Sequence, residues 1–308
     1  MFICDRIRIK IDVFFPYIMN NLEILPTNDV IFKMIFGDKR HPRILIHFLN
    51  SVIRPQSPIT SIDIRQTELS KDLVSQKGVR LDIVATTESN EIISIEMQKG
   101  REPHMVARSL FYWSKLFSGQ LEVSESYKNL HRTISINILD FKLFEQDKRF
   151  WRKAVLLDKE TNEQLTDLLE LHFIELGKMK EMREDSPITF WIEFFKDPYS
   201  EKVKKLCEYV PEIKEAKEVY EKAKSDPEAQ ELIRLREKGL RDYISGLENA
   251  HEEGLAEGRE EGIAIGEERG IEQKTREAAL NMKSKGFDNS LIADCLSISE
   301  EDLEKLLK

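Results

Sequence analysis

The chain has 308 residues, 41% of them hydrophobic and 33% charged, which predicts one sizeable folded domain with appended segments rather than a disordered chain. Three widely spaced cysteines exclude a disulfide framework and a zinc site, no apolar run is long enough for a membrane span, and we expect a cytoplasmic protein. The net charge of −9 belongs to the C-terminal half: residues 21–150 hold 18 Lys and Arg against 16 Asp and Glu, so nucleic acid stays open as a partner.

The first twenty residues, MFICDRIRIKIDVFFPYIMN, alternate charged and apolar side chains and lack the features of a signal peptide. We interpret residues 1–20 as an N-terminal extension. Because the pattern of the following domain opens only after Met19, we expect translation to begin at that methionine and residues 1–18 to be dispensable.

Residues 21–200 mix helical and strand patterns, which predicts an α/β domain. The segment NDVIFKMIFGD has the apolar spacing of a helix, with Asn28 or Asp29 as its N-cap and Gly37 as its stop. Further elements are expected in chain order: a helix over 42–53, strands over 59–69, 79–86 and 91–98, a helix over 105–121 and a strand over 132–141. Helices should therefore lie on both sides of a mixed sheet.

The remainder of the chain is expected to be helical. Residues 201–276 are charged throughout, and the stretch SDPE predicts a helix start in which Ser225 and Glu228 form a capping box. Residues 277–308 predict a small module of two short amphipathic helices separated by a Ser-rich turn.

Glycine recurs at every fourth position from Gly254 to Gly270, and Gly246 and Ala250 extend the spacing backward. Such a stripe of small residues allows a second helix to approach closely, which predicts a homodimer formed through this C-terminal helix. Interior glycines also weaken a helix, so a solvated acidic linker remains the alternative.

Two carboxylates, Asp82 and Glu96, interrupt the β-branched patterns of VRLDIVAT and EIISIEMQ. The polar linker TTESNE predicts a hairpin, and an antiparallel register whose residue numbers sum to 178 sets Asp82 opposite Glu96, with Glu88–Asn90 as the loop. Their Cβ atoms would then lie about 5 Å apart, and two acids that close need a compensating charge such as a divalent cation. Ordinary exposed acids on a solvated face are the alternative that spacing leaves open.

The blocks PTNDVIFKMIFGD, VRLDIVA, ISIEMQ, RSLFYWSKLFSGQL and TISINILDF resemble, in this order, the Rpn family of recombination-promoting nucleases and putative transposases in the PD-(D/E)xK nuclease superfamily. The resemblance covers about residues 21–308 and includes the glycine-periodic acidic tail. It implies a restriction-endonuclease-like core followed by an α-helical C-terminal extension. It also implies a DNA endonuclease that uses Mg²⁺ (or Mn²⁺) and is linked to recombination or transposition.

By this resemblance Asp82 and Glu96 match the catalytic, metal-binding acids, and the main-chain carbonyl of Met97 supplies a further metal ligand. Gln98 occupies the catalytic position where the wider superfamily has lysine. Glutamine carries no positive charge and cannot act as a general base, so water activation is expected to depend mainly on the metal. Lys99 points to the opposite face by strand alternation and is a poor substitute.

Three side chains on neighbouring helices are candidate DNA contacts. Arg108 and Tyr112 lie four residues apart on one helix face and resemble a Gln-x-x-x-Tyr element of some relatives, although an exposed helix arginine is the commoner case. Lys33 is expected to contact DNA from the first helix, with a solvated lysine as the alternative. Asp29 is a candidate for an additional acid on that helix, and the N-cap is its alternative role.

Two other functions remain open at this point. The protein could keep the nuclease fold as a DNA-binding protein with little catalysis, because Gln98 replaces the superfamily lysine. It could also be an assembly protein whose role lies in the helical tail. Metal-dependent cleavage of DNA separates the endonuclease from both.

Overall fold

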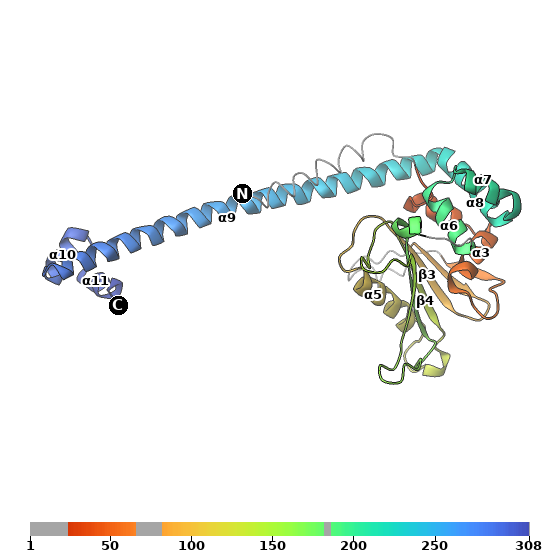
Figure 1. The fold of residues 1–308 in the computed structure, drawn as a ribbon, viewed down its shortest axis with the longest axis horizontal. Helices are drawn as coiled ribbons and strands as arrows, with labels where there is room; N and C mark the ends of the chain where they lie inside the picture. Colours follow the sequence, from red (N-terminus) through yellow and green to blue (C-terminus); the bar gives the residue numbers. More distant parts are fainter. Residues whose placement is uncertain (1–23, 66–81, 182–185, 308) are drawn as a thin grey trace. The chain divides into compact units, whose positions relative to one another are not determined.

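The computed structural model describes residues 24–65, 82–181 and 186–307. The expected N-terminal extension and start at Met19 lie outside the described residues. Within the described residues, six strands form one mixed sheet in the order β1-β2-β3-β4-β6-β5 (Figure 1). The strands are β1 (Ile62–Arg65), β2 (Ile83–Thr87), β3 (Ile92–Gln98), β4 (Thr133–Leu139), β5 (Trp151–Val155) and β6 (Leu169–Glu175).

The centre of the sheet is parallel, because β3 pairs with β4 and β4 with β6 in the same direction, while β2 and β5 are antiparallel to their neighbours. Parallel strands are covered on both faces and therefore have nearly continuous apolar sequences. The segment TISINIL of β4 fits this rule, since all seven of its residues are buried.

Helices cover both faces of the sheet. In chain order the helices of the described residues are α2 (Asp29–Phe36), α3 (Pro42–Ile53), α5 (Met105–Ser118), α6 (Pro187–Lys196), α7 (Glu201–Tyr209), α8 (Pro211–Ser225), α9 (Pro227–Ser284), α10 (Asn289–Leu296) and α11 (Glu300–Leu306), with short 3₁₀ turns η1 (Tyr127–Asn129) and η2 (Leu176–Glu181); the last two helices and most of α9 belong to a C-terminal unit, not to the sheet layers. Figure 1 shows α5 on one side of the sheet and α3 and α6 on the other. This arrangement confirms the expected mixed sheet between helices, followed by a helical extension.

The main hydrophobic core lies between the sheet and the layer formed by α2, α3, α6, α7 and α8. Its centre is aromatic: the Trp191 ring lies 5.3 Å from Phe36 and 5.9 Å from Phe48, edge to face in both cases. The indole Nε1–H of Trp191 donates to Nδ1 of His47 at 3.0 Å, so the one polar group of this side chain is satisfied. Each such buried side chain contributes about 1.5–3 kcal/mol of transfer free energy.

Helix α2 begins where the sequence predicts. The Asn28 side chain accepts hydrogen bonds from the main-chain N–H groups of Val30 and Ile31, at 3.0 and 3.4 Å. Asn28 is therefore the N-cap, and the N-cap role considered for Asp29 is wrong. Asp29 is the first helical residue, where its negative charge complements the helix dipole. Gly37 ends the helix as expected.

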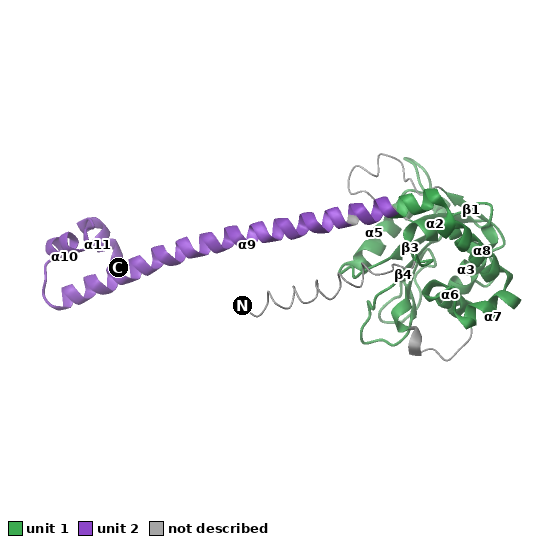
Figure 2. Cartoon of the chain, turned by 90° about the horizontal axis from the view of Figure 1, so that it is seen from above, with its two compact units in different colours: residues 1–233 green, residues 234–308 purple. Residues whose placement is uncertain are grey.

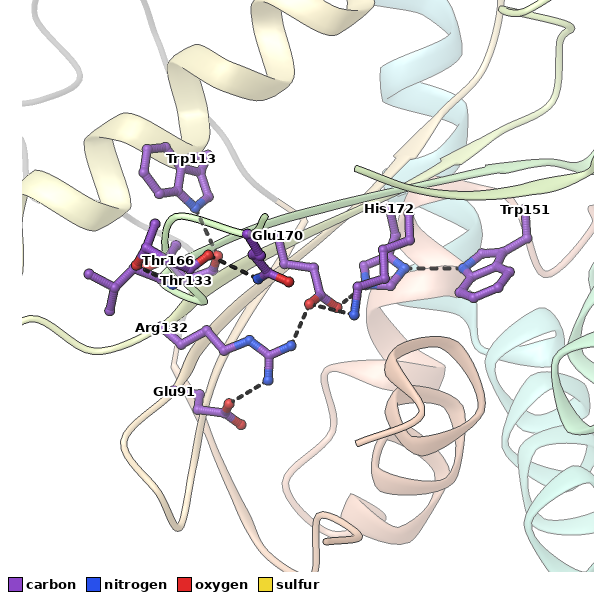
Figure 3. A network of polar contacts seen from close by, with 11 residues as sticks. Glu91, Trp113, Arg132, Thr133, Trp151, Thr166, Glu170 and His172 are labelled. Carbon is purple, nitrogen blue, oxygen red and sulfur yellow. Dashed lines mark hydrogen bonds and ion pairs between the residues drawn. The ribbon is translucent and has the colours of Figure 1, made fainter. Parts of the chain in front are cut away.

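A buried charge network joins the N-terminal ends of the parallel strands (Figure 3). The Arg132 guanidinium binds Glu91 at 3.0 Å and also Glu170, which Lys153 contacts at 2.8 Å. His172 accepts from the indole N–H of Trp151 through Nδ1 and therefore donates to Glu170 through Nε2, at 2.6 Å.

The ionisation state of this network follows from its contacts. Burial raises the pKa of Glu170, but the hydrogen bonds from His172 and Lys153 outweigh burial and bring that pKa to about 2. Burial also lowers the pKa of His172, so the imidazole is neutral. Glu170 is thus ionised at this end of the sheet and is paired with Arg132 and Lys153.

The described chain divides into two compact units, residues 1–233 and 234–308 (Figure 2). The first unit continues past residue 200, where the sequence pattern placed the end of the nuclease-like domain, because buried residues such as Leu206 and Ile213 of α7 and α8 belong to the main core. The capping box expected from Ser225 and Glu228 is wrong. Asp226 caps α9 instead, accepting from the N–H of Glu228 at 2.8 Å.

The second unit contains most of α9 together with α10 and α11. In the range where the sequence predicts a small helical module, the two short helices pack on the end of α9 through Ala279, Ile292, Ala293 and Leu303. Among the described residues, no helix combines the length and the apolar composition that a membrane span requires.

Candidate active site

Glu96 lies near the carboxyl end of β3, and Asp82 lies directly before β2, opposite Glu96, at the end of the sheet where α/β proteins commonly bind ligands. The pairs Ile83 with Ile95 and Val84 with Ser94 have the predicted register, and extending it by one position sets Asp82 opposite Glu96. The hairpin loop is also as expected, since Thr87 and Glu91 close it by a main-chain hydrogen bond of 3.0 Å.

Glu96 is buried and the side chain of Asp82 is largely shielded from solvent, which decides between the two interpretations of this sheet face. The side chain of Glu96 is 6% exposed and that of Asp82 is 12% exposed, so the alternative of ordinary solvated acids is wrong. Burial raises the pKa of Asp82, and it raises the pKa of Glu96 to about 6, against the opposing effect of Arg108. An acid with a pKa near neutrality is common at functional sites.

Lys33 on α2 compensates the charge of Asp82. Its ammonium Nζ lies 3.2 Å from Asp82 Oδ1, and the main-chain N–H of Met97 donates to Oδ2 at 2.8 Å. Asp29, one turn before Lys33, is close enough for its charge to raise the pKa of Asp82. The sequence offered Lys33 as a DNA contact and Asp29 as an additional acid, and the structure places the Lys33 ammonium against Asp82, with Asp29 one helical turn earlier on α2.

Arg108 on α5 compensates the charge of Glu96. One guanidinium nitrogen, Nη2, donates to Oε1 of Glu96, and the guanidinium carbon lies 5.2 Å from the centre of the Tyr112 ring. The Nε of Arg108 is buried and has no hydrogen-bond partner among the described residues. The predicted pair Arg108 and Tyr112 thus does share one helix face, and that face is turned toward Glu96.

Ser109 and Asn137 are polar residues of the site that the sequence analysis missed. Asn137 pairs with Glu96 across β3 and β4, and its side-chain nitrogen donates to the carbonyl of His172 at 3.1 Å. Its oxygen lies 2.9 Å from Ser109 Oγ on α5. The sequence feature that could have identified Asn137 is its place inside the apolar run TISINIL, because a polar residue in a buried strand needs a hydrogen-bond partner.

Gln98 lies at the rim of the site, on the strand face that it shares with Glu96 by alternation. It is half-buried, and its Nε2 donates to the carbonyl of Lys99 at 3.2 Å. Asp140, also missed, follows β4 at the same sheet edge and accepts from the N–H of Gly100 at 2.9 Å. Burial raises the pKa of Asp140.

The donor set suits a hard divalent cation. Two carboxylates from Asp82 and Glu96, with the main-chain carbonyl of Met97 and water, are the oxygen ligands that Mg²⁺ takes when it keeps much of its hydration shell. In the described ranges, no group of three or more His, Cys, Asp and Glu side chains is arranged to hold a metal. A cation here would therefore be held by few protein ligands.

Comparison with known proteins gives one match. The chain matches the family of PD-(D/E)XK nuclease family transposases over residues 26–250. No curated protein and no solved structure matches it. The matched range includes the whole sheet and every residue of the candidate site.

Proposed function

The chain belongs to the PD-(D/E)XK nuclease family transposases and has their restriction-endonuclease-like core, and from this premise we propose that it is a divalent-metal-dependent endonuclease that hydrolyses phosphodiester bonds of DNA. The observation that carries the proposal is the pair of largely shielded acids, Asp82 before β2 and Glu96 near the carboxyl end of β3, whose side chains are 12% and 6% exposed. Burying two carboxylates side by side costs several kcal/mol, and metal binding is a function that accounts for the cost. The family name supports a link to transposition or recombination.

In this proposal Asp82, Glu96 and the Met97 carbonyl hold Mg²⁺ or Mn²⁺. When bound, the metal lowers the pKa of a water molecule and stabilises charge on the phosphate. Arg108 and Lys33 provide positive charge for the phosphate backbone, and Tyr112 holds the Arg108 guanidinium in place. Asp29 acts through its charge beside Asp82.

Gln98 has a limited role in this mechanism. Its amide can donate to a phosphate oxygen or accept from a water molecule, but it cannot take up a proton at neutral pH. Its half-buried place at the rim is consistent with orienting either group. The positive charge that the superfamily lysine supplies must then come from Lys33 and Arg108.

A DNA-binding protein with little catalysis is the second candidate. It is favoured by Gln98 itself and by the ion pairs of both acids with Lys33 and Arg108, which satisfy the site without a metal. The two candidates differ in cleavage and agree in DNA binding.

The test is cleavage of supercoiled plasmid with Mg²⁺, with Mn²⁺ and with a chelator. Asp82→Asn and Glu96→Gln each remove a charged ligand and should lower the cleavage rate about a hundredfold or more. Asp63→Asn is the matched control, because Asp63 is an exposed acid on β1 whose partner is Lys39. Cleavage by either site variant at the wild-type rate contradicts the proposal, whereas a salt-sensitive DNA shift without cleavage supports the second candidate.

Self-association through α9 is also part of the proposal, since an enzyme that cuts both strands benefits from a second active site. In the second unit as described, a Cβ added at Gly254, Gly258 or Gly262 meets no heavy atom within 4 Å. Packing inside this unit therefore gives no reason for these glycines. Leu247, Leu255 and other apolar side chains of α9 are exposed, which supports a second helix as their partner.

A further inference from the structure

The Lys33 ammonium contacts Oδ1 of Asp82, the carboxylate oxygen that remains for a metal ion because Oδ2 already accepts a main-chain hydrogen bond. The backbone N–H of Met97 holds Oδ2 at 2.8 Å, and the Lys33 ammonium holds Oδ1 at 3.2 Å. A cation that binds Asp82 through Oδ1 must take this place from Lys33, because two positive charges cannot share it without strong repulsion.

Lys33 is easier to displace than Arg108. The Lys33 ammonium is a point charge on a flexible four-carbon stem, and its ion pair with Asp82 is a single contact of 3.2 Å. The Arg108 guanidinium lies over the Tyr112 ring, and its Nε is buried. Movement of Lys33 into solvent therefore breaks one ion pair, while movement of Arg108 breaks several contacts.

The charges of the site determine where the Lys33 ammonium goes once a metal ion displaces it from Asp82. The pairs of Asp82 with Lys33 and of Glu96 with Arg108 are each neutral. A bound divalent cation adds two positive charges at the acids and repels the Lys33 ammonium, which the four-carbon stem lets move away from Asp82. A nearby DNA phosphate then becomes its best partner.

From this geometry we infer that Lys33 is a placeholder cation: it neutralises Asp82 in the metal-free protein, a divalent cation displaces it, and it then binds a DNA phosphate. The inference rests on the proposed function, because it takes Asp82 and Glu96 as the metal ligands. Metal and DNA binding are then coupled, and the coupling is reciprocal: each ligand tightens the binding of the other by the same factor.

The test compares wild-type protein with Lys33→Met and Lys33→Gln by calorimetric titration with Mn²⁺. Removal of a competing cation should tighten Mn²⁺ binding, by about tenfold. Lys33→Arg keeps the charge and should bind Mn²⁺ with wild-type affinity. Lys39→Met is the matched control: Lys39 follows the same helix, is 62% exposed and pairs with Asp63 outside the site.

DNA affinity provides the second measurement, by fluorescence anisotropy of a labelled duplex in Ca²⁺ and in a chelator. Lys33→Met should weaken DNA binding severalfold in Ca²⁺ and leave it unchanged in the chelator, where the lysine is held by Asp82. A merely structural role would weaken Mn²⁺ binding and would lower DNA affinity in both conditions, which overturns the inference. Wild-type protein that binds no Mn²⁺ overturns the proposed metal site itself, so the two failures are distinguishable.

Discussion

The hydroxyl of Ser109 on α5 lies 2.9 Å from the side-chain oxygen of Asn137 on β4, and both side chains are completely buried. This contact joins α5 to the sheet at the residue next to Arg108, whose guanidinium binds Glu96, and the Ser109 hydroxyl also lies 2.8 Å from the carbonyl oxygen of Met105. A neutral contact inside the core thus lies directly beside a charged group of the candidate site.

Ser109→Ala should lower the free energy of unfolding by about 1–3 kcal/mol, because it takes a partner from a buried amide oxygen. Urea denaturation measures the change. Ser114→Ala on the same helix is the control, since the Ser114 hydroxyl is exposed and donates only to the carbonyl of Phe111. Equal stability of the two variants would show that the buried contact contributes nothing.

Metal affinity should depend on pH around the pKa of Glu96. Burial raises this pKa to about 6, so below that value a proton competes with the cation for the carboxylate. Mn²⁺ affinity should be constant above about pH 7 and fall about tenfold per pH unit below pH 6. Titration calorimetry between about pH 5 and pH 8 measures it, and affinity independent of pH would contradict the assignment of Glu96 as a ligand.

Glu96→Gln should stabilise the metal-free protein. An acid whose pKa rises from 4.5 to about 6 on folding contributes stability below pH 4.5 and loses it as the pH rises through 6, which costs about 2 kcal/mol at pH 8. The neutral amide avoids this cost. Urea denaturation in a chelator should show the gain at pH 8 and little of it near pH 4.5, while Glu122→Gln, at an exposed acid, should show neither.

Gln98→Lys should keep or increase cleavage. Gln98 shares the strand face of Glu96 and is half-buried at the rim, so a lysine there can place its charge beside the phosphate without a change of strand register. Plasmid cleavage in Mg²⁺ measures the effect. A folded variant without cleavage would count against the orientation of residue 98 toward the site.

Substitution of Gly254, Gly258 and Gly262 by alanine tests whether the glycine stripe is a helix–helix interface or a solvated linker. Each change should favour the helix by about 1 kcal/mol, and the added methyl groups meet nothing within the unit. If a second copy packs on this stripe, sedimentation equilibrium should show a weaker dimer despite the stronger helix. A protein that is monomeric before and after the changes would leave the stripe as a linker.

The hairpin could be predicted because its information is local. Strand alternation and a short polar loop fix the register of β2 and β3, and both are visible in the sequence. The same holds for α2, whose cap at Asn28 is directly before the apolar pattern. Arg108 was identified by its spacing from Tyr112, again within one helix.

The contacts that complete the site join distant segments and could not be predicted in this way. Nothing in the local pattern brings Lys33 to Asp82, because that contact depends on how α2 packs on the core. Strands β5 and β6 were missed, since WRKAV and LELHFIE carry the charges of the buried network. The charged surfaces of α7 and α8 likewise hid the buried positions Leu206 and Ile213.

The buried network at the opposite end of the sheet gives the protein two glutamates with opposite acid–base behaviour. Glu170, with a pKa of about 2, stays ionised and keeps its ion pairs in mild acid, whereas Glu96, with a pKa of about 6, is already protonated there. At a pH between these two pKa values, Glu170 keeps its ion pairs while Glu96 loses the negative charge that would bind a metal. Lowering the pH through about 6 should therefore release the metal while the ion pairs of Glu170 persist, which makes metal-free protein accessible without a chelator.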